Sequence, residues 1–379
     1  MAKHAGLPWD MVFGSDLFGH FKPDPETYLG VAKLMDLAPD QVMMAAAHNG
    51  DLANARALHH PDQGRSGLEA LYSYPSRTAM LDVLLRTGYA SAVQERAERG
   101  LPARLIEVGH AVLPLLAGRE ARFIHQYVLR AEVENLKLVI RAVYHGLSAE
   151  QIAAYVLELG ELATIDLRGL LDAHDLPDLI ERLRGSAYGA ALSAAAHGVD
   201  DIGPFALEVA LELDYYERLW SAADTLHASD TAIAHHLLGI LFDILNLRWI
   251  ARYRDALGLS PEEILNYTLR QGRWVTAAVR RTLAEDAGQP WGAVLAHTPY
   301  APLLVDASGR GFDTVATALW RVLGVEIQRR LRQYPFQIGV PLGFLLAQEI
   351  EIRDLQVLFA AKDLNVPAPE ALECVASVR

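Results

Sequence analysis

Two short patterns recur three times in the same order along this chain, and that repetition most constrains what it can fold into. The first pattern is an acid, then Asn or Asp three residues later, then Leu, then a basic residue or Gln. Its acids are Glu132, Asp243 and Glu351. Its amide positions are Asn135, Asn246 and Asp354, which lie 111 and 108 residues apart.

The second pattern, Leu-x-x-Thr/Ser-x-Tyr, recurs at a similar interval, with its tyrosines 99 and 112 residues apart. It ends at Tyr89, Tyr188 and Tyr300, and each Tyr motif precedes its acid–Asn motif. Two patterns that repeat in a fixed order predict an internally triplicated domain. An interval of 108 to 111 residues far exceeds the roughly 34 to 47 residues of common helical repeats, which argues against an open solenoid.

Within each acid–Asn motif, the acid and the amide fall on one face of a helix, because positions three and four residues apart are neighbours there. The pairs adjoin Leu136, Leu247 and Leu355 in an apolar stripe. Buried acids and amides are costly unless they are hydrogen-bonded, so we expect each pair to hold a neighbouring helix end or loop. The alternative is three active sites, which is disfavoured because no His, Ser or Cys recurs beside the pairs.

Composition excludes several function classes. A net charge of −13 argues against nucleic acid as the main partner. Cys374 is the single cysteine, so no internal disulfide forms and a reducing, cytoplasmic location is favoured. The first ten residues lack the apolar run of a signal peptide. The most apolar stretch, Ile233 to Ile250, contains two His, an Asp and an Arg, so we interpret it as a core helix rather than a membrane span.

No motif for a cofactor or a nucleotide emerges. The chain has no Gly-x-x-x-x-Gly-Lys-Ser/Thr, so we expect no direct nucleotide binding through a P-loop. The pair His235-His236 is a poor metal site, because neighbouring helical residues point about 100° apart. We therefore expect no catalytic residue, no cofactor and no metal.

The chain divides into three segments. Residues 1–58 show a strand-loop-helix-strand-loop-helix pattern that is typical of an α/β domain, with a helix starting at Glu26. Residues 59–67 have the composition of a linker. Residues 68–379 show helical periodicity, and Gly146 and Gly258 end the helices of the first two acid–Asn motifs. Asn365 stands where that Gly would be in the third.

The N-terminal segment resembles the haloacid dehalogenase superfamily, most closely the 2-haloacid dehalogenases. The runs Gly14 to Pro25 and Met43 to Leu52 are similar to that family's third and fourth motifs. The resemblance implies that Lys22 would offset the charge of a nucleophile, while Asn49 and Asp51 would help to position the site. The family's nucleophilic aspartate has no counterpart in this sequence, and the covalent ester cannot form without it. We therefore expect residues 1–58 to be an incomplete, inactive α/β fragment.

The long segment resembles a different family. The acid–Asn and Tyr motifs, together with Pro204-Phe205 and the run Leu213 to Tyr216, are similar to the C subunit of V/A-type rotary ATPases, called d in eukaryotes. The likeness covers about residues 68–379. It implies a mainly α fold in which three pseudo-symmetric helical bundles form a funnel. It also implies two partners, the rotor shaft subunits and the membrane rotor ring. We expect Tyr215 and Tyr216 to form an aromatic packing site with their hydroxyls satisfied at its rim.

Three functions from different classes fit these residues. The first is a non-catalytic rotor subunit of the central stalk that couples the shaft to the ion-translocating ring. The second is a haloacid-dehalogenase-type hydrolase fragment with a helical appendage, which the missing nucleophile disfavours. The third is a helical scaffold protein, which the length of the repeat disfavours.

Overall fold

The computed structural model describes residues 25–36, 65–94, 97–285, 291–301, 312–331 and 337–377, and no strand occurs in these ranges. The predicted mainly α fold class is confirmed. Helix α2 (Pro25–Leu34) begins one residue before the predicted start. The two strands expected within residues 1–58 lie outside the described residues.

The helices after α2 follow one another closely along the chain. Those before the second acid–Asn motif are α4 (Arg65–Tyr72), α5 (Arg77–Leu84), α6 (Ala90–Val93), α7 (Ala103–Val112), α8 (Gly118–Val128), α9 (Arg130–His145), α10 (Ala149–Ile152), α11 (Leu167–Leu170), α12 (Leu176–Leu183), α13 (Gly189–Ala195), α14 (Val199–Ile202) and α15 (Phe205–Asp224). Those from the second motif onward are α16 (Ala228–Ala251), α17 (Pro261–Asn266), α18 (Ala277–Glu285), α19 (Trp291–Val294), α21 (Phe312–Leu331), α22 (Gly339–Asp363) and α23 (Ala368–Glu373). Short 3-10 turns stand between several of them, for example Ala97–Gly100 and Ala153–Tyr155.

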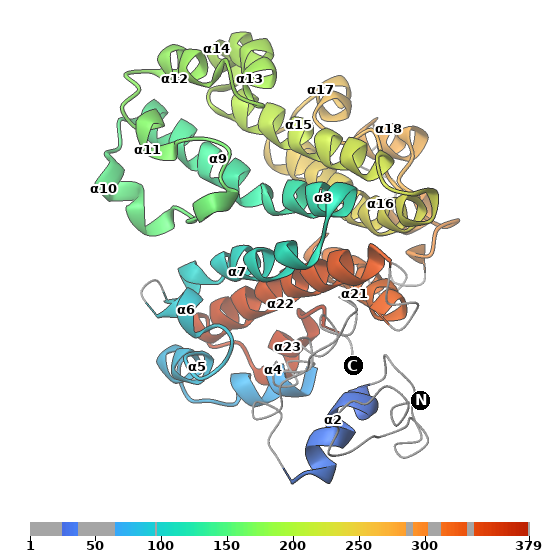
Figure 1. Cartoon of the computed structure of the whole chain (residues 1–379). Coiled ribbons are helices and arrows are strands. Elements are labelled where there is room, and N and C mark those ends of the chain that lie inside the picture. Colours follow the sequence, from blue (N-terminus) through green and yellow to red (C-terminus); the bar gives the residue numbers. More distant parts are fainter. Residues whose placement is uncertain are drawn as a thin grey trace, which may run out of the picture.

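The three acid–Asn motifs lie on α9, α16 and α22. In Figure 1, α15 packs against α8 and α16, α22 packs against α7 and α21, and α16 also packs against α21. Helices α10 to α14 lie at the outer end of α9, and α17 and α18 lie beside α16. Because α4, α5 and α23 contact α22, each motif helix has a group of shorter helices beside it.

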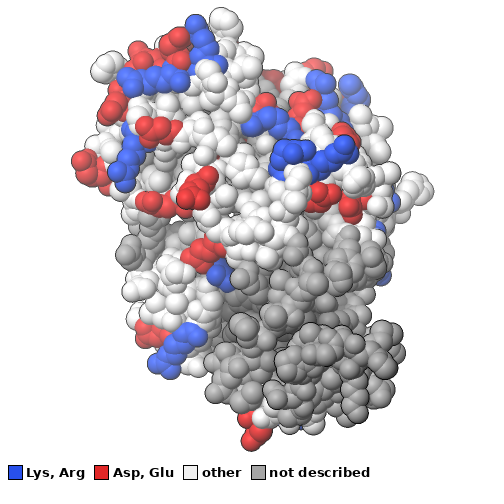
Figure 2. All heavy atoms as spheres, in the orientation of Figure 1, with Lys and Arg blue, Asp and Glu red and all other residues white. Residues whose placement is uncertain are grey.

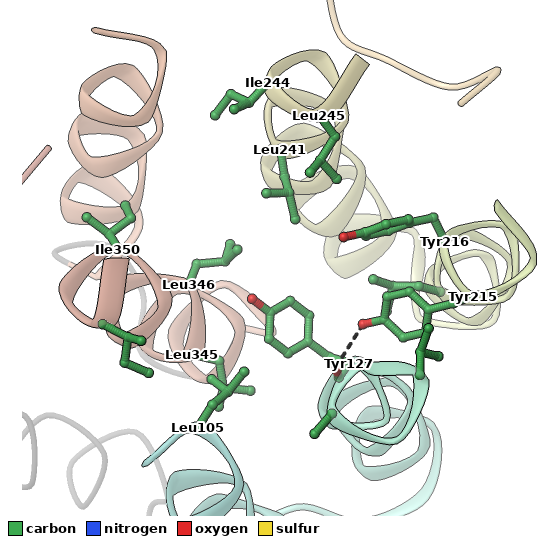
Figure 3. Close-up of a cluster of buried hydrophobic side chains, with 14 of the residues drawn as sticks. Leu105, Tyr127, Tyr215, Tyr216, Leu241, Ile244, Leu245, Leu345, Leu346 and Ile350 are labelled. Atoms are coloured by element: carbon green, nitrogen blue, oxygen red, sulfur yellow. Dashed lines mark hydrogen bonds between the residues drawn. The ribbon is translucent and has the colours of Figure 1, made fainter. Parts of the chain in front are cut away.

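An aromatic and aliphatic cluster lies where these helices meet (Figure 3). Tyr215 and Tyr216 point from α15 toward Tyr127 of α8, and leucines of α16 and α22 close the other sides. The Tyr215 hydroxyl donates a hydrogen bond to the Tyr127 carbonyl oxygen at 2.8 Å. The expectation that these hydroxyls lie at a rim is wrong, because Tyr215 and Tyr216 are both buried in the core.

The three motif helices end in the same way. Gly146 and Gly258 have φ values of +66° and +64°, which Gly adopts without a steric cost from Cβ. Asn365 takes the equivalent place with φ +54°, as the sequence predicted. A π-helical turn, Arg252–Ala256, follows α16. It supplies the one extra residue between the amide and the cap of the second motif.

Helix α16 is the most apolar element of the fold. Together with its π-helical turn it is long and apolar enough to cross a membrane by length and composition, but 83% of its apolar window is buried inside the protein. Ile233, Leu238 and Ile250 are all in the core. The interpretation of this stretch as a core helix agrees with that burial.

Helices α4 and α5 pack against the C-terminal helix α22, and α4 also packs against α23 (Figure 1). The Tyr72 hydroxyl of α4 donates to the Val366 carbonyl oxygen at 2.6 Å, and Lys362 Nζ donates to the Tyr72 carbonyl oxygen at 2.6 Å. Arg77 of α5 forms an ion pair with Asp363 at 3.3 Å. These contacts close the helical part of the chain upon itself.

Acidic and basic side chains are interspersed on the face drawn in Figure 2. Between α9 and α15, two acids that the sequence places on one helix are paired within the chain. Glu208 accepts hydrogen bonds from Arg141, and Glu212 accepts one from Lys137. These pairs fasten α15 to the first motif helix.

Candidate functional site

We call the hydrogen bonds that the acid and amide of one acid–Asn motif make with a loop a joint. The first joint connects α9 to the loop that follows α10. Asn135 Nδ2 donates to the Leu157 carbonyl oxygen at 2.7 Å, and the Leu157 N–H donates to Asn135 Oδ1 at 2.8 Å. One amide thus satisfies both backbone groups of a residue 22 positions further along. Glu132 is also buried and accepts from the Thr164 and Ile165 N–H groups at 2.6 and 3.3 Å.

The second joint repeats this arrangement on α16. Asn246 donates to the Leu269 carbonyl oxygen at 3.0 Å and accepts from its N–H at 2.7 Å. Asp243 accepts from the N–H groups of Arg273, Trp274 and Val275, each at 2.9 Å.

Gly272 stands against the carboxylate of the second joint. A Cβ at Gly272 would lie 2.6 Å from Asp243 Oδ1, so glycine permits the close approach of the loop. Burial raises the pKa of Asp243 to about 6, although three backbone N–H groups and Tyr300 oppose that shift.

The third joint uses a carboxylate where the others use an amide. Asp354 accepts from the N–H groups of Ala376 and Ser377 at 2.7 Å each, and Arg353 pairs with it at 3.1 Å. A carboxylate can accept two backbone N–H groups but cannot donate to a carbonyl oxygen. The departure from Asn therefore matches a loop that presents two donors, and burial raises the pKa of Asp354.

Glu351 is the least satisfied acid of the three. Gln348 Nε2 donates to its Oε2 at 3.0 Å, while its Oε1 has no hydrogen-bond partner within the described residues. Tyr89 lies beside it without hydrogen-bond geometry between the two side chains, and the Tyr89 hydroxyl also has no partner in that part of the chain. Burial raises the pKa of Glu351 to about 7.

The Tyr motif builds a tight turn after a helix. In the second copy, the Ser186 hydroxyl donates to the Leu183 carbonyl oxygen at 2.7 Å and accepts from the Tyr188 N–H at 3.2 Å. The same two hydrogen bonds recur in the other copies, at Thr87 and Thr298. The turn directs each tyrosine ring into the core, where all three rings are fully buried.

In space, the Tyr motifs of the second and third copies contact the acid of the preceding acid–Asn motif and not the acid that follows them. The Tyr188 hydroxyl donates to Glu132 at 2.7 Å, and the Tyr300 hydroxyl donates to Asp243 at 2.8 Å. Each tyrosine therefore meets the acid that precedes it in the chain. Tyr89 has no preceding acid motif, and it lies beside Glu351, the last one.

An ion pair that the sequence did not indicate joins α9 to α22 and is partly buried. Arg130 at the start of α9 pairs with Glu349 of α22, and the Tyr127 hydroxyl donates to Glu349 at 2.6 Å. The available signal was an acid next to the third motif in an otherwise apolar stretch, residues 338–350. This contact fastens the first joint helix to the third.

The arrangement holds the motif helices to neighbouring loops through hydrogen bonds of the acid and amide side chains. His235 stacks on Trp220 with ring centroids 4.0 Å apart, whereas His236 Nε2 lies 3.1 Å from Glu326 Oε2, so the two rings face different partners. No group of three potential metal ligands occurs within the described ranges. The dehalogenase-like positions Lys22, Asn49 and Asp51 lie outside the described residues.

Comparisons with known proteins agree on one family. The family model described as ATP synthase (C/AC39) subunit matches residues 64–373. The chain is similar to the C subunit of the A-type ATP synthase of Methanothermobacter thermautotrophicus, with 29% identity over 273 residues and 70% of each chain covered. The corresponding protein of Methanocaldococcus jannaschii is 24% identical over 281 residues, covering 72% of this chain and 70% of that one. That of Haloferax volcanii is 23% identical over 290 residues, covering 73% and 79%.

Proposed function

Because the chain belongs to the ATP synthase (C/AC39) subunit family, we propose that it is a non-catalytic rotor subunit of a V/A-type ATPase. In this role it couples the rotating central shaft to the membrane ring that translocates ions. It works on the cytoplasmic side of the membrane, and its partners are the shaft subunits and the ring. It binds neither nucleic acid nor nucleotide directly.

The observation that carries this proposal is the closure of the chain through three similar joints. Two joints lie at Asn135 and Asn246, and the third lies at Asp354 of α22. On the same helix, Glu351 lies beside Tyr89, which comes from the start of the helical segment. A closed body with a dense core deforms little under load. We infer that residues 68–379 form three related bundles around a common axis, which suits a part that receives torque at one end and delivers it at the other.

The same closure weighs against an open scaffold, since an open superhelix keeps its first and last units apart. Here Tyr72 and Val366 are hydrogen-bonded across 294 residues of sequence. The hydrolase alternative concerns residues 1–58 and offers no role for the joints.

Reassembly tests the proposal. We would purify the ATPase from cells that lack the subunit and separate it by size with and without added full-length chain. We expect the catalytic part with its shaft to separate from the membrane ring when the chain is absent, and to rejoin it when the chain is added. Stable union of shaft and ring without the chain contradicts the proposed role.

A further inference from the structure

One guanidinium in the second joint is buried without an acid. Arg280 of α18 is 5% exposed, and its Nη1 donates to Thr268 Oγ1 at 3.1 Å. That is the one hydrogen bond the structure gives this side chain within the described ranges, and its Nε has no partner there. A buried charge is costly unless an opposite charge offsets it.

A second guanidinium lies within electrostatic reach. The pKa of Arg280 is lowered by burial and further by the charge of Arg270, which is exposed to solvent. Neither Arg270 nor Arg280 forms an ion pair with any acid in the described residues. Like charges repel, so an anion between or beside the two guanidinium groups would relieve their repulsion.

The corresponding part of the first joint has the opposite charge. Residues 267–284 contain four Arg and no Asp or Glu, whereas residues 155–172 contain four acids and one Arg, in a chain whose net charge is −13. Counted from the residue that precedes α11 and α18, Arg280 occupies the place of Leu170, which is buried. Leu157 and Leu269 are the residues that Asn135 and Asn246 hold. Counted from these two leucines, Arg270 occupies the place of Glu158, and Thr268 occupies the place of Val156. The pair of basic residues Arg270 and Arg280 therefore occurs in the second joint and is not repeated in the first.

We propose that the second joint contains a binding site for a phosphate-class oxyanion, formed by Arg280 on its inner side and Arg270 on its solvent side. The Nε and Nη2 edge of a guanidinium presents two parallel N–H donors that match two oxygens of such an anion. Two unpaired guanidinium charges favour a doubly charged anion over a carboxylate. The shared chemistry is a phosphate group, either free in solution or in the headgroup of an anionic lipid.

The test measures anion binding to the purified full-length chain. We would titrate inorganic phosphate by calorimetry and by thermal shift at constant ionic strength, with acetate as the comparison anion. The variant Arg280→Leu places at this position the residue that the first joint has there. Arg281→Leu is the matched control, because Arg281 is exposed and paired with Glu285.

We expect phosphate to raise the melting temperature of the wild type and of Arg281→Leu, and to bind Arg280→Leu more weakly by about tenfold or more, which corresponds to about 1.4 kcal/mol. Arg270→Gln, a change at an exposed position, should weaken binding too, and it keeps the test valid if Arg280→Leu does not fold. Equal responses of all variants to phosphate, or acetate acting as strongly as phosphate, would overturn the proposal.

Vesicles identify the source of the phosphate group. In a parallel measurement, the chain would be sedimented with vesicles of phosphatidylglycerol and of phosphatidylcholine. Binding to the anionic vesicles that depends on Arg280, with no effect of free phosphate, assigns the site to a lipid headgroup. Binding of free phosphate alone assigns it to a soluble anion. Failure of both probes refutes the site and leaves the rotor proposal untouched, because reassembly of the ATPase is a separate measurement.

Discussion

Replacing Asn246 by Leu removes the amide that holds the second joint together. The change leaves the N–H and the carbonyl oxygen of Leu269 without partners, and Leu269 is 3% exposed. Each buried backbone group left unsatisfied costs about 1–3 kcal/mol. Allowing for the extra apolar surface that leucine buries, we expect a loss of about 3 kcal/mol in the free energy of unfolding.

Thermal unfolding and hydrogen exchange measure this effect. A loss of about 3 kcal/mol corresponds to a fall in melting temperature of roughly 6–12 °C for a large domain. The amide proton of Leu269 should exchange faster, because its opening no longer breaks a hydrogen bond to the side chain. The matched control is Asn266→Leu, the same substitution at an exposed position of α17. If Asn246→Leu has the melting temperature of the wild type and its Leu269 amide stays protected from exchange, the hydrogen bonds of Asn246 do not stabilise the second joint as proposed.

Three further outcomes follow from the joints and from the N-terminal segment. Burial raises the pKa of Glu351 to about 7, so the folded state binds its proton more tightly than the unfolded state. The stability it contributes is present below about pH 4 and is lost as pH rises through about 7. The melting temperature of Glu351→Gln should therefore fall less over that range than the melting temperatures of the wild type and of the exposed control Glu370→Gln; parallel curves would contradict the burial of this charge. In urea unfolding, Tyr188→Phe should cost about 1–2 kcal/mol through the lost hydrogen bond to a charged group, and Tyr89→Phe should cost clearly less because its hydroxyl has no partner in the described residues. Purified full-length chain should not release chloride from 2-chloropropionate, and Lys22→Ala should change nothing; turnover that this substitution abolishes would restore the hydrolase hypothesis.

The helical class and the ends of the motif helices were predictable from the sequence because they depend on local chemistry. Apolar periodicity determines which segments form helices, and the left-handed cap at Asn365 follows from its place in the repeat. The cost of burying Asn135 and Glu132 predicts that they hold a neighbouring loop, but it does not say which one. The partner loop depends on where the chain returns, which is a long-range property.

The pairing of tyrosines with acids was not predictable from order along the chain. Order suggests that Tyr188 belongs with Asp243, whereas the fold brings it to Glu132. Periodicity also gives no sign that α4 returns to α23, since the hydrogen bond from Tyr72 to Val366 joins residues with no shared motif. The sequence did not single out Arg280 for a related reason. What distinguishes Arg280 is its burial without an acidic partner, and that depends on which residues the fold brings beside it.

Ion pumping per ATP hydrolysed tests whether the chain transmits rotation from the shaft to the ring. We would reconstitute the complete ATPase in vesicles with the wild-type chain, with Asn135→Leu, with Asn246→Leu, or without the chain, and record both rates together.

We expect hydrolysis to continue in every case, because the proposed role assigns no nucleotide site to this chain. Pumping per ATP should fall for Asn135→Leu and Asn246→Leu, and it should fall furthest without the chain. The reason is that a loosened or absent coupling subunit lets the shaft turn without turning the ring. Removing residues 1–58 should leave the number of ions pumped per ATP hydrolysed unchanged. Unchanged pumping per ATP in Asn135→Leu and Asn246→Leu and in the complete absence of the chain would contradict the rotor account.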